Sequence, residues 1–443
     1  MSHRYLPQSD NDIREMLSVV GCSDVDELYA DIPESIRFKG DYDLPQGMSE
    51  MEVRARIDSM GAANRQLLCF AGAGVYDHYT PAVVADIVRR SEYLTSYTPY
   101  QAEISQGTQH CIFEYQTMMA RLTGMDVSNA SMYDGTTASA EAMLMSIANA
   151  KKANRYLVSE TVDKKILDVI LTYAHFHGVT VDIVPAKDGV TDSNAMAQML
   201  EQGGVAGVMV QQPNRFGIVE DYTGFADTIH QHKALLAINS VAFDLALLKT
   251  PGEWGADIAV GDGQSLGIPM SFGGPYVGYM CTTEKLVRKM PGRVVGMTKD
   301  SRGQRAFVLT LQAREQHIRR QKATSNICSN QSLMALYTTV YMSVMGKEGL
   351  KEAAQLSYAG AHYLYEQLIA TQLFTPTFQQ TFFNEFCVDY KGDVDKLQQT
   401  LIDNGIFGGI KVDEHTIMFA VTEKRTKQEV DRLIEIIKSN SNL

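Results

Sequence analysis

The sequence GADIAVGDGQSLGIPMSFGGPYVG, at residues 255–278, decides the fold of this 443-residue chain. Its apolar start at 258–260 predicts a short buried strand. A polar turn at 262–265 follows, and then a loop rich in glycine and proline. The side chain at the centre of the turn, Gln264, is an amide, and no lysine stands anywhere in the stretch. An amide cannot form an imine, so this turn lacks the group that covalent amine chemistry needs.

The segments on both sides of this stretch extend the same pattern. Helices and short apolar strands alternate from about residue 76 to residue 325. Strands are expected at 156–159, 179–184, 205–211, 235–239, 258–260 and 276–281, with helices such as 139–151, 162–176 and 195–201 between them. This alternation indicates βαβ units and a mainly parallel sheet. The pattern resembles the large pyridoxal phosphate (PLP) enzymes of the aminotransferase-like class, in which the lysine that holds the cofactor follows such a strand.

The chain divides into three expected regions. Residues 1–75 are expected to form an N-terminal helical arm, in which the S-x-x-E pattern from Ser49 to Glu52 predicts a helix start by a capping box. Residues 76–325 are expected to form the large α/β domain. Residues 326–443 are expected to form a smaller C-terminal α+β domain, with helices at 330–345, 348–371 and 427–437 and strands at 382–390 and 416–421.

The charge and residue composition of the chain disfavour several classes of binding partner. The chain has 40 basic and 52 acidic residues, a net charge of −12, which disfavours nucleic acid and anionic membranes. No apolar run reaches the roughly 18 residues of a membrane span, and the first residues show no signal-peptide apolar region. The six cysteines are far apart, as expected for reduced core thiols of a cytoplasmic protein. No metal site is expected, since the histidine pairs 175/177 and 230/232 point apart on a helix.

A turn at residues 134–137 precedes a strongly predicted helix. It reads Asp134, Gly135, Thr136 and Thr137. The free N–H groups of a helix N-terminus, together with the threonine hydroxyls, could cradle a phosphate or another anion, and the glycine allows close approach of the backbone. The alternative is an ordinary N-cap after a turn.

The segment YTPYQAEISQG, at residues 97–107, is dense in hydrogen-bonding groups. Two tyrosines bracket a turn stiffened by proline, so the segment can present phenols and a carboxylate to a ligand at low entropic cost. A surface loop whose tyrosines pack on the sheet is an equally good interpretation. The candidate ligand contacts are Tyr97, Thr98, Tyr100, Gln101, Glu103, Ser105 and Gln106.

Two further segments carry candidate residues. The glycine-rich stretch at 70–81 contains Gly72, Gly74 and His78, but no strand–GxGxxG–helix frame surrounds it, so it is not a dinucleotide fingerprint. A lone histidine there is more often a structural hydrogen-bonder than a catalyst. The basic cluster at 314–322 could grip a carboxylate, a phosphate or an acidic partner, or could be a solvated helix face. Its candidate contacts are Arg314, His317 and Arg319.

These motifs, in this order, resemble the glycine cleavage system P-protein, and in particular subunit 1 of its two-subunit bacterial form. The resemblance covers nearly the whole chain and is weaker in the last third. It is carried by AGAGVYDHYTP, YTPYQAEISQG, YDGTTASAEA, GEWGADIAVGDGQSLGIPMSFGGPYVG, MPGRVVG and REQHIRRQKATSNICSNQ. Several of these strings are long and unusual, which speaks against chance similarity.

The resemblance implies the aminotransferase fold type I and a role in glycine decarboxylation. In that family, PLP on the lysine-bearing half acts on glycine, CO₂ leaves, and the aminomethyl group passes to the lipoyl arm of H-protein. In split forms the lysine-bearing half is a separate subunit, and a two-plus-two heterotetramer is implied. That half carries a His-Lys-Thr turn where this chain has Gly263, Gln264 and Ser265. Asn239 stands in place of the acid that pairs with the pyridine nitrogen, and Asp244 is a poor substitute.

The resemblance therefore predicts a chain that is catalytically incomplete alone, with PLP on the partner subunit and not held covalently here. The loop at 97–107 is expected to form a wall of the partner's active site, because the family places it near the cofactor. Arg314, His317 and Arg319 are weaker wall candidates. The turn at 134–137 is expected to be a relic that still binds an anion.

Two other functions remain open. An autonomous PLP enzyme would need a lysine elsewhere, and Lys249 is the candidate in this part of the chain, although it precedes the strand at 258–260. A non-enzymatic binding protein would use the dead site to sense glycine, PLP or a lipoyl domain. Ligand-dependent thermal shifts of the isolated chain would favour that second alternative.

Overall fold

The computed structural model describes residues 5–150 and 152–439, and its contacts divide the chain into two units, Met1–Arg65 and Gln66–Leu443. The last residue of the helix expected at 139–151 lies outside the described residues. The expected boundaries at residues 75 and 325 stay predictions. Among the described residues, no helix is both long enough and apolar enough to cross a membrane.

The first unit contains two helices that both begin with capping boxes. They are α1 (Asp10–Val20) and α2 (Glu50–Ala62), with short 3-10 turns at Asp26–Tyr29 and Glu34–Ile36 between them. At the start of α2, the Ser49 hydroxyl accepts from the Glu52 N–H at 3.3 Å, and the Glu52 carboxylate accepts from the Ser49 N–H at 2.8 Å. The helix start that the S-x-x-E pattern predicts is therefore confirmed.

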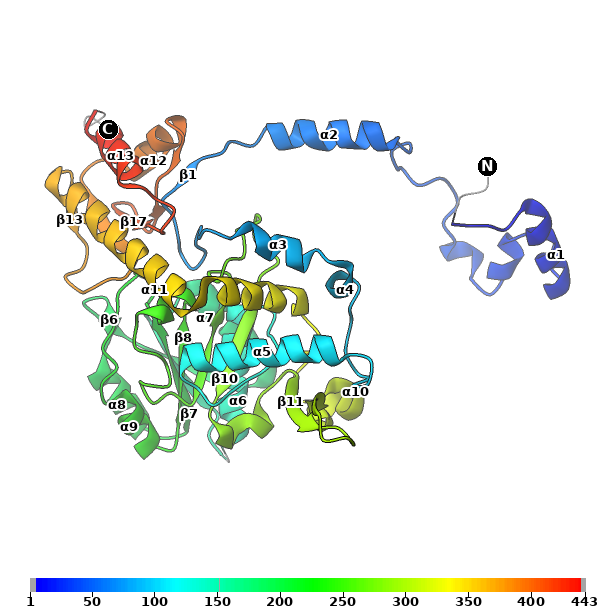
Figure 1. Cartoon of the computed structure of the whole chain (residues 1–443), viewed down its shortest axis with the longest axis horizontal. Coiled ribbons are helices and arrows are strands. Elements are labelled where there is room, and N and C mark those ends of the chain that lie inside the picture. Colours follow the sequence, from blue (N-terminus) through cyan, green and yellow to red (C-terminus); the bar gives the residue numbers. More distant parts are fainter. Residues whose placement is uncertain (1–4, 151, 440–443) are drawn as a thin grey trace. The chain divides into compact units, whose positions relative to one another are not determined.

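A seven-stranded sheet forms the centre of the second unit, in the order β2-β10-β9-β8-β7-β3-β4 (Figure 1). The strands are β2 (Val127–Ser128), β3 (Arg155–Ser159), β4 (Thr180–Val184), β7 (Val205–Gln212), β8 (Leu235–Ser240), β9 (Ile258–Asp262) and β10 (Gly278–Thr282). The strands from β9 to β4 run parallel, whereas β10 is antiparallel to β9 and β2. The predicted mixed α/β fold with a mainly parallel sheet is confirmed.

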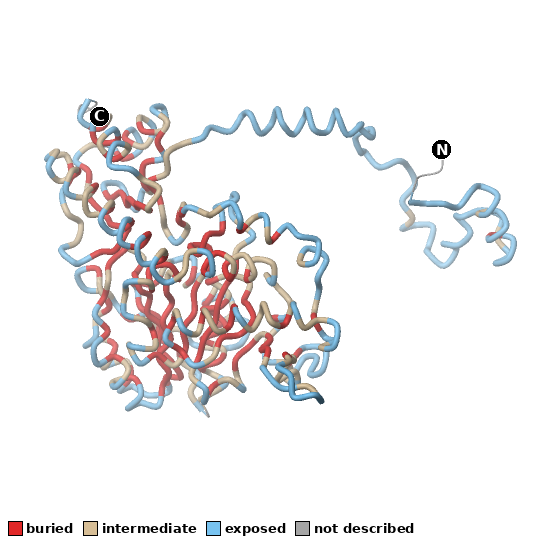
Figure 2. Tube along the Cα trace, in the orientation of Figure 1, coloured by how far each residue is buried: buried red, intermediate tan, exposed pale blue. Residues whose placement is uncertain are grey.

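Helices cover both faces of this sheet because its strands are apolar on both sides. Successive residues of β3 show this: Tyr156 and Val158 pack with α6 and α7, and Leu157 packs with α8 and α9. Figure 2 shows the buried trace concentrated in the sheet. The helices before α11 are α3 (Ala82–Val88), α4 (Ser91–Leu94), α5 (Gln106–Thr123), α6 (Gly135–Asn149), α7 (Lys164–His177), α8 (Ser193–Glu201), α9 (Phe225–Gln231) and α10 (Gln316–Arg319).

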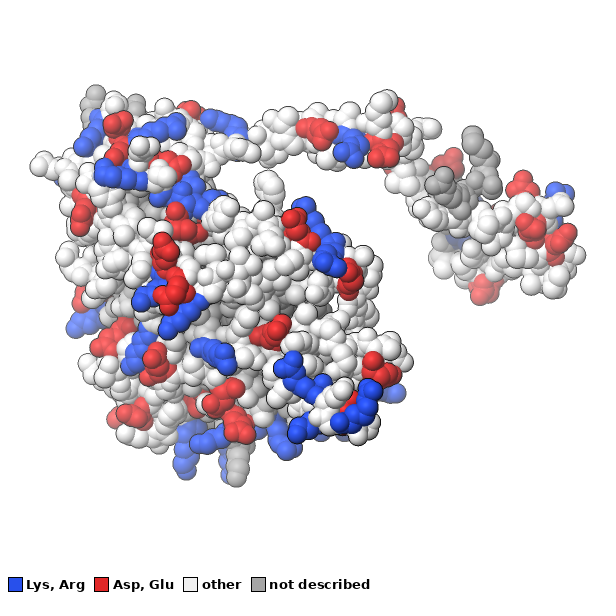
Figure 3. All heavy atoms as spheres, viewed as in Figure 1, with Lys and Arg blue, Asp and Glu red and all other residues white. Residues whose placement is uncertain are grey.

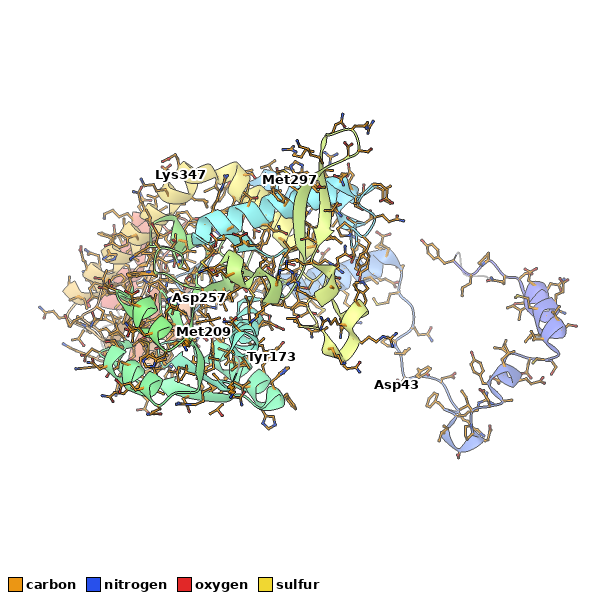
Figure 4. The ribbon with its side chains drawn as sticks, turned by 90° about the horizontal axis from the view of Figure 1, so that it is seen from below. Asp43, Tyr173, Met209, Asp257, Met297 and Lys347 are labelled. Atoms are coloured by element: carbon orange, nitrogen blue, oxygen red, sulfur yellow. The ribbon has the colours of Figure 1, made fainter. Side chains whose placement is uncertain are left out.

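Two hairpins lie outside the predicted alternation of strands and helices. The larger one pairs β11 (Val294–Lys299) with β12 (Arg305–Thr310), and the smaller pairs β5 (Ala186–Lys187) with β6 (Val190–Thr191). Figure 4 shows the larger hairpin, with Met297 labelled, projecting from the body of the unit. Its strands carry few buried residues, unlike the central strands, although β12 contains an apolar run at 306–309.

The C-terminal residues form a second sheet with its own helices. The antiparallel order is β13-β14-β17-β16, with β13 (Phe374–Pro376), β14 (Glu385–Tyr390), β16 (Ile410–Lys411) and β17 (Thr416–Ala420). The helices are α11 (Ser332–Ala370), α12 (Val394–Asp403) and α13 (Lys427–Ser439), and β1 (Leu68–Cys69) pairs with β15 (Ile406–Phe407). Gly346 has a left-handed φ of 62° and breaks α11 into two helices, close to the predicted break between 345 and 348.

The cysteines are only partly as expected. All six are free thiols, but only Cys281 and Cys387 are buried. Cys328 is exposed and the other three are half-buried, so the expectation of core thiols is wrong for most of them.

Candidate functional site

A cavity of about 420 Å³ lies where the parallel strands β7, β8 and β9 end and α6 begins. This edge of an open α/β sheet is where such folds bind ligands, and the volume falls in the range of small-molecule pockets. The polar residues of its lining are Tyr133, Asp134, Thr136, Asp163, Lys165, Gln211, Asn239, Ser240, Asp262, Ser265, Tyr276 and Gln331.

Gln264 has a structural role beside this cavity. Its side chain is 1% exposed. The amide oxygen accepts from the Tyr76 N–H at 2.9 Å, and the amide nitrogen donates to the Tyr76 carbonyl at 2.9 Å and to the Ile268 carbonyl at 2.8 Å. The residue at the centre of the turn therefore fastens the glycine-rich loop to the turn after β9, and it offers no amine to the cavity.

The turn at 134–137 already gives two of its N–H groups to carboxylates of this chain. Asp134 is the N-cap of α6 and accepts from the Thr137 N–H at 2.8 Å. Asp262 accepts from the Gly135 N–H at 3.0 Å and from the Gln264 N–H at 2.8 Å. A Cβ at position 135 would lie 2.8 Å from the Asp262 nitrogen, so only glycine permits this approach. The geometry is that of an N-cap with a second carboxylate beside it, an arrangement that repels a phosphate.

Burial raises the pKa of Asp262 to about 7. The folded state therefore binds a proton at Asp262 more tightly than the unfolded state does, because the unfolded aspartate has a pKa near 3.8. The stability that protonated Asp262 contributes is fully present below the unfolded pKa and is lost as the pH rises through the folded pKa.

Asp262→Asn is therefore expected to change the pH dependence of stability. The free energy of unfolding of the native chain, minus that of the variant, should fall between about pH 4 and pH 7, by at most about 1.4 kcal/mol per pH unit, and level off above pH 7. Urea unfolding at a series of pH values measures this difference. Asp227→Asn, at an exposed position on α9 outside the cavity, is the control; a flat difference curve for Asp262→Asn would contradict the assignment.

The position that would pair with a pyridine nitrogen holds Asn239, whose amide nitrogen donates to the Ser139 hydroxyl at 2.9 Å. Asp244 lies in a 3-10 turn (Phe243–Ala246), is 1% exposed and does not line the cavity. Neither of its carboxyl oxygens has a hydrogen-bond partner among the described residues. The turn after β9 holds Gln264, the turn at 134–137 has two carboxylates, and β8 offers an uncharged amide, so the cavity does not fit PLP.

Lys249, the candidate lysine of the autonomous-enzyme alternative, does not line the cavity, whereas Lys165 does. Lys249 places its Nζ 3.7 Å from the centre of the Trp254 ring, in a cation–π contact, and does not line the cavity. Lys165, on the first turn of α7, does line it. The sequence pattern did not single out Lys165, because it stands in an ordinary amphipathic helix.

The glycine-rich loop forms one wall of the cavity through residues 73–75. Gly72 lies behind this wall, and a Cβ there would be 2.2 Å from a carboxylate oxygen of Glu385. Glu385 is buried and accepts from the Ala73 N–H and, at 3.1 Å, from the Tyr76 hydroxyl. His78 is 7% exposed and its Nδ1 lies 2.7 Å from a Glu423 oxygen. Its contacts are those of a structural histidine that joins the loop to Glu423, three residues after β17.

A second polar centre surrounds Arg293, which is 3% exposed. The guanidinium donates to the Tyr100 hydroxyl at 2.8 Å, to Glu315 at 3.2 Å and to the Cys328 sulfur at 3.2 Å. It also donates to the hydroxyls of Thr98 and Ser329. One arginine thus ties the loop at 97–107 to the segments before and after α10. The sequence contained Arg293 in the MPGRVVG string but gave no sign of these partners.

The candidate residues of the loop at 97–107 fall into two groups. Gln106 exchanges hydrogen bonds with the Phe307 backbone, at 2.8 and 2.9 Å, and so anchors the loop to β12. Tyr97 is 83% exposed and Tyr100 is 49% exposed. Gln101 and Glu103 are exposed, and Thr98 and Ser105 are half-buried. Among the described residues, none of this loop lines the 420 Å³ cavity.

The basic candidates at 314–319 lie beside the Arg293 centre. Arg314 donates to the carbonyls of Leu311, at 3.1 Å, and Gly292, at 2.9 Å, so it holds backbone. His317 is half-exposed, 3.4 Å from Glu315 and edge-on to the Tyr100 ring at 5.6 Å. Arg319 donates to the Ala313 carbonyl at 3.3 Å. Figure 3 shows acidic and basic side chains interspersed, with basic ones gathered over the region that Figure 1 labels β11 and α10.

Comparisons with known proteins agree with this architecture. The family model described as "Glycine cleavage system P-protein" matches residues 3–437. A protein of Lysinibacillus sphaericus (strain C3-41), named "Probable glycine dehydrogenase (decarboxylating) subunit 1", is 47% identical, and the alignment covers 98% of each chain.

Solved structures give the same result. The crystal structure of a glycine decarboxylase (P-protein) of the glycine cleavage system, in an inhibitor-bound form, has a TM-score of 0.91 at 40% identity and covers 99% of this chain and 100% of that one. A C-DES mutant with glycine covalently linked to its PLP cofactor has a TM-score of 0.62 at 14% identity, covering 86% and 98% of the two chains. At that identity the likeness concerns the fold alone, and it confirms the predicted PLP-enzyme scaffold.

Proposed function

Because the chain belongs to the glycine cleavage system P-protein family, we propose that it is the half of a two-subunit glycine decarboxylase that carries no Schiff-base lysine. The proposal rests on Gln264, which stands where the lysine would be. Its side chain is hydrogen-bonded to backbone groups of Tyr76 and Ile268. The relatives' name, subunit 1, implies a second subunit. With that subunit, the enzyme decarboxylates glycine, releases CO₂ and passes the aminomethyl group to the lipoyl arm of H-protein.

The cofactor belongs on the second subunit in this proposal. PLP, when bound there, supplies the electron sink for the loss of CO₂. This chain's contribution is to shape and close the site that the second subunit provides. Its own cavity supports that assignment, since Asp262 and Asp134 hold the N–H groups of Gly135 and Thr137 and place two carboxylates where a phosphate would lie.

The loop at 97–107 is the proposed wall toward the second subunit. Tyr97, Tyr100 and Glu103 present two phenols and a carboxylate on an exposed segment. The Tyr100 hydroxyl accepts from Arg293, which leaves its own proton free to donate to a ligand. Because Arg293 and Gln106 hold this loop at both ends, the exposed groups are positioned before a ligand arrives.

An autonomous PLP enzyme has less support. Lys249 packs on Trp254, and Lys165, which does reach the cavity, does not follow β9.

The proposal also includes a cytoplasmic location and an assembly of two copies of this chain with two copies of the second subunit.

The test is glycine–bicarbonate exchange with lipoylated H-protein, measured for this chain alone, for the lysine-bearing subunit alone and for their mixture. Each subunit alone is expected to be inactive, and the mixture is expected to exchange label. A chain that exchanges label unaided, or a second subunit that needs no addition, would contradict the proposal.

A further inference from the structure

The cavity at the ends of β7, β8 and β9 keeps polar groups that have no hydrogen-bond partner among the residues that the structure describes. Gln211 and Asn239 are register partners on neighbouring strands, so their side chains lie side by side on the face toward α6. They are 9% and 6% exposed, and both line the cavity. Buried amides of this kind normally have partners for all their groups.

The hydrogen-bond network fixes which atoms of these amides are free. The Ser139 hydroxyl donates to the Gly135 carbonyl at 2.8 Å, so it can only accept from Asn239, and this leaves Asn239 Oδ1 as an acceptor without a partner among the described residues. Gln211 Oε1 accepts from the Asp163 N–H at 2.8 Å, and Gln211 Nε2 is a donor without a partner among the described residues. The cavity floor therefore presents one acceptor and one donor, carried by residues paired on neighbouring strands.

Charged groups stand on both sides of this floor. Asp134 and Asp262 lie at the start of α6 and the end of β9, whereas Asp163 lies beside Gln211, and its carboxylate caps α7 by accepting from the Lys165 N–H at 2.7 Å. Lys165 lines the cavity and forms no ion pair with any described residue. The side chains of Val75, Ile166 and Val241 supply apolar surface between these groups.

We propose that this cavity binds a small zwitterion with the chemistry of an α-amino acid. Its ammonium group donates to Asn239 Oδ1 and faces Asp262 and Asp134. Its carboxylate accepts from Gln211 Nε2 and pairs with Lys165. The binding is non-covalent, because the turn holds Gln264 instead of a lysine, and the volume leaves room for a side chain. The cavity is then a sensing site of this chain, separate from the active site proposed for the second subunit.

The test is isothermal titration of the isolated full-length chain. The probes are glycine, L-alanine and L-serine, with ethylamine and propionate as single-group analogues, and PLP and inorganic phosphate as the ligands of the ancestral site. An amino acid is expected to bind at least about tenfold more tightly than ethylamine or propionate, because it makes both sets of contacts.

Three variants identify the site. Lys165→Met is expected to weaken amino-acid binding about tenfold and leave ethylamine unchanged, and Asp262→Asn is expected to weaken both. Lys164→Met, a neighbouring exposed lysine that does not line the cavity, is the matched control and should bind as the native chain does. Absence of amino-acid binding, tighter binding of phosphate or PLP, or equal losses in the Lys164 and Lys165 variants would each overturn the proposal.

The result does not depend on the proposed decarboxylase activity, because no second subunit, PLP or H-protein takes part in the titration. Failure of the exchange assay with successful titration would leave a ligand-binding protein on a PLP-enzyme scaffold. Successful exchange without amino-acid binding would leave the decarboxylase subunit and remove the sensing site.

Discussion

Replacing Arg293 by methionine is expected to lower the glycine exchange rate of the two-subunit enzyme by about 100-fold, the scale of a misplaced active-site wall. The guanidinium is the common partner of Tyr100, Glu315 and Cys328. Without it, the exposed part of the loop at 97–107 loses the contact that fixes Tyr100. Glu315, which is 9% exposed, would be left as a buried charge without its cation, a loss of about 3–5 kcal/mol in stability.

The Arg293 variants must be compared at matched folding. Far-ultraviolet circular dichroism and a denaturant titration establish the folded fraction before exchange rates are compared. Arg293→Lys keeps the charge but not the planar fork, so it should recover stability better than activity. Arg288→Met, at an exposed position in the turn Glu284–Lys289, is the matched control. A folded Arg293→Met chain that supports full exchange would show that the loop position does not matter.

Replacing Gln264 by alanine is expected to destabilise the isolated chain by about 2–4 kcal/mol. The change leaves the Tyr76 N–H and the carbonyls of Tyr76 and Ile268 without their partner in a buried site, and each such group costs about 1–3 kcal/mol before any relaxation. Urea unfolding monitored by fluorescence measures the loss. Gln304→Ala, in the exposed connection between β11 and β12, is the control and should stay within about 0.5 kcal/mol of the native chain.

A lysine at the same position tests whether the structural role of Gln264 can be distinguished from the ability of the cavity to hold PLP. Gln264→Lys can donate to the two carbonyls but leaves the Tyr76 N–H unpaired and buries an amine, so we expect it to be destabilised as well. It is also expected to remain colourless with PLP, because Asp262 and Asp134 still accept from the N–H groups of Gly135 and Thr137 and place two carboxylates at the turn at 134–137. A yellow Gln264→Lys chain would show that the cavity retains the cofactor fit that we exclude.

The sequence predicted the central strands well because buried parallel strands are apolar on both faces and end in recognisable turns. The strand expected at 258–260 is β9, and the amide in the following turn is buried in the framework as Gln264. The β11–β12 hairpin was not predicted, although its strands read VVGMTK and RAFVLT and contain an apolar run at 306–309. The prediction rested on an alternation of helices and strands, and a hairpin of mostly half-buried or exposed residues stands outside that alternation.

The site was less predictable, because its decisive contacts join residues far apart in the chain. Asp262 reaches across 127 residues to the N–H of Gly135, and this contact decides against a phosphate at the turn. Glu385 accepts from Ala73 across 312 residues. No spacing rule links such pairs. The loop at 97–107 was recognisable by its residue types, but the arginine that holds it was visible only in three dimensions.

The central claim, that this chain lacks the covalent cofactor site, is tested most directly by borohydride reduction of the assembled two-subunit enzyme with PLP, followed by peptide mass mapping of both chains. We expect the pyridoxyl label on a lysine of the second subunit and on no peptide of this chain. A label on Lys165 or Lys249 of this chain would contradict the account.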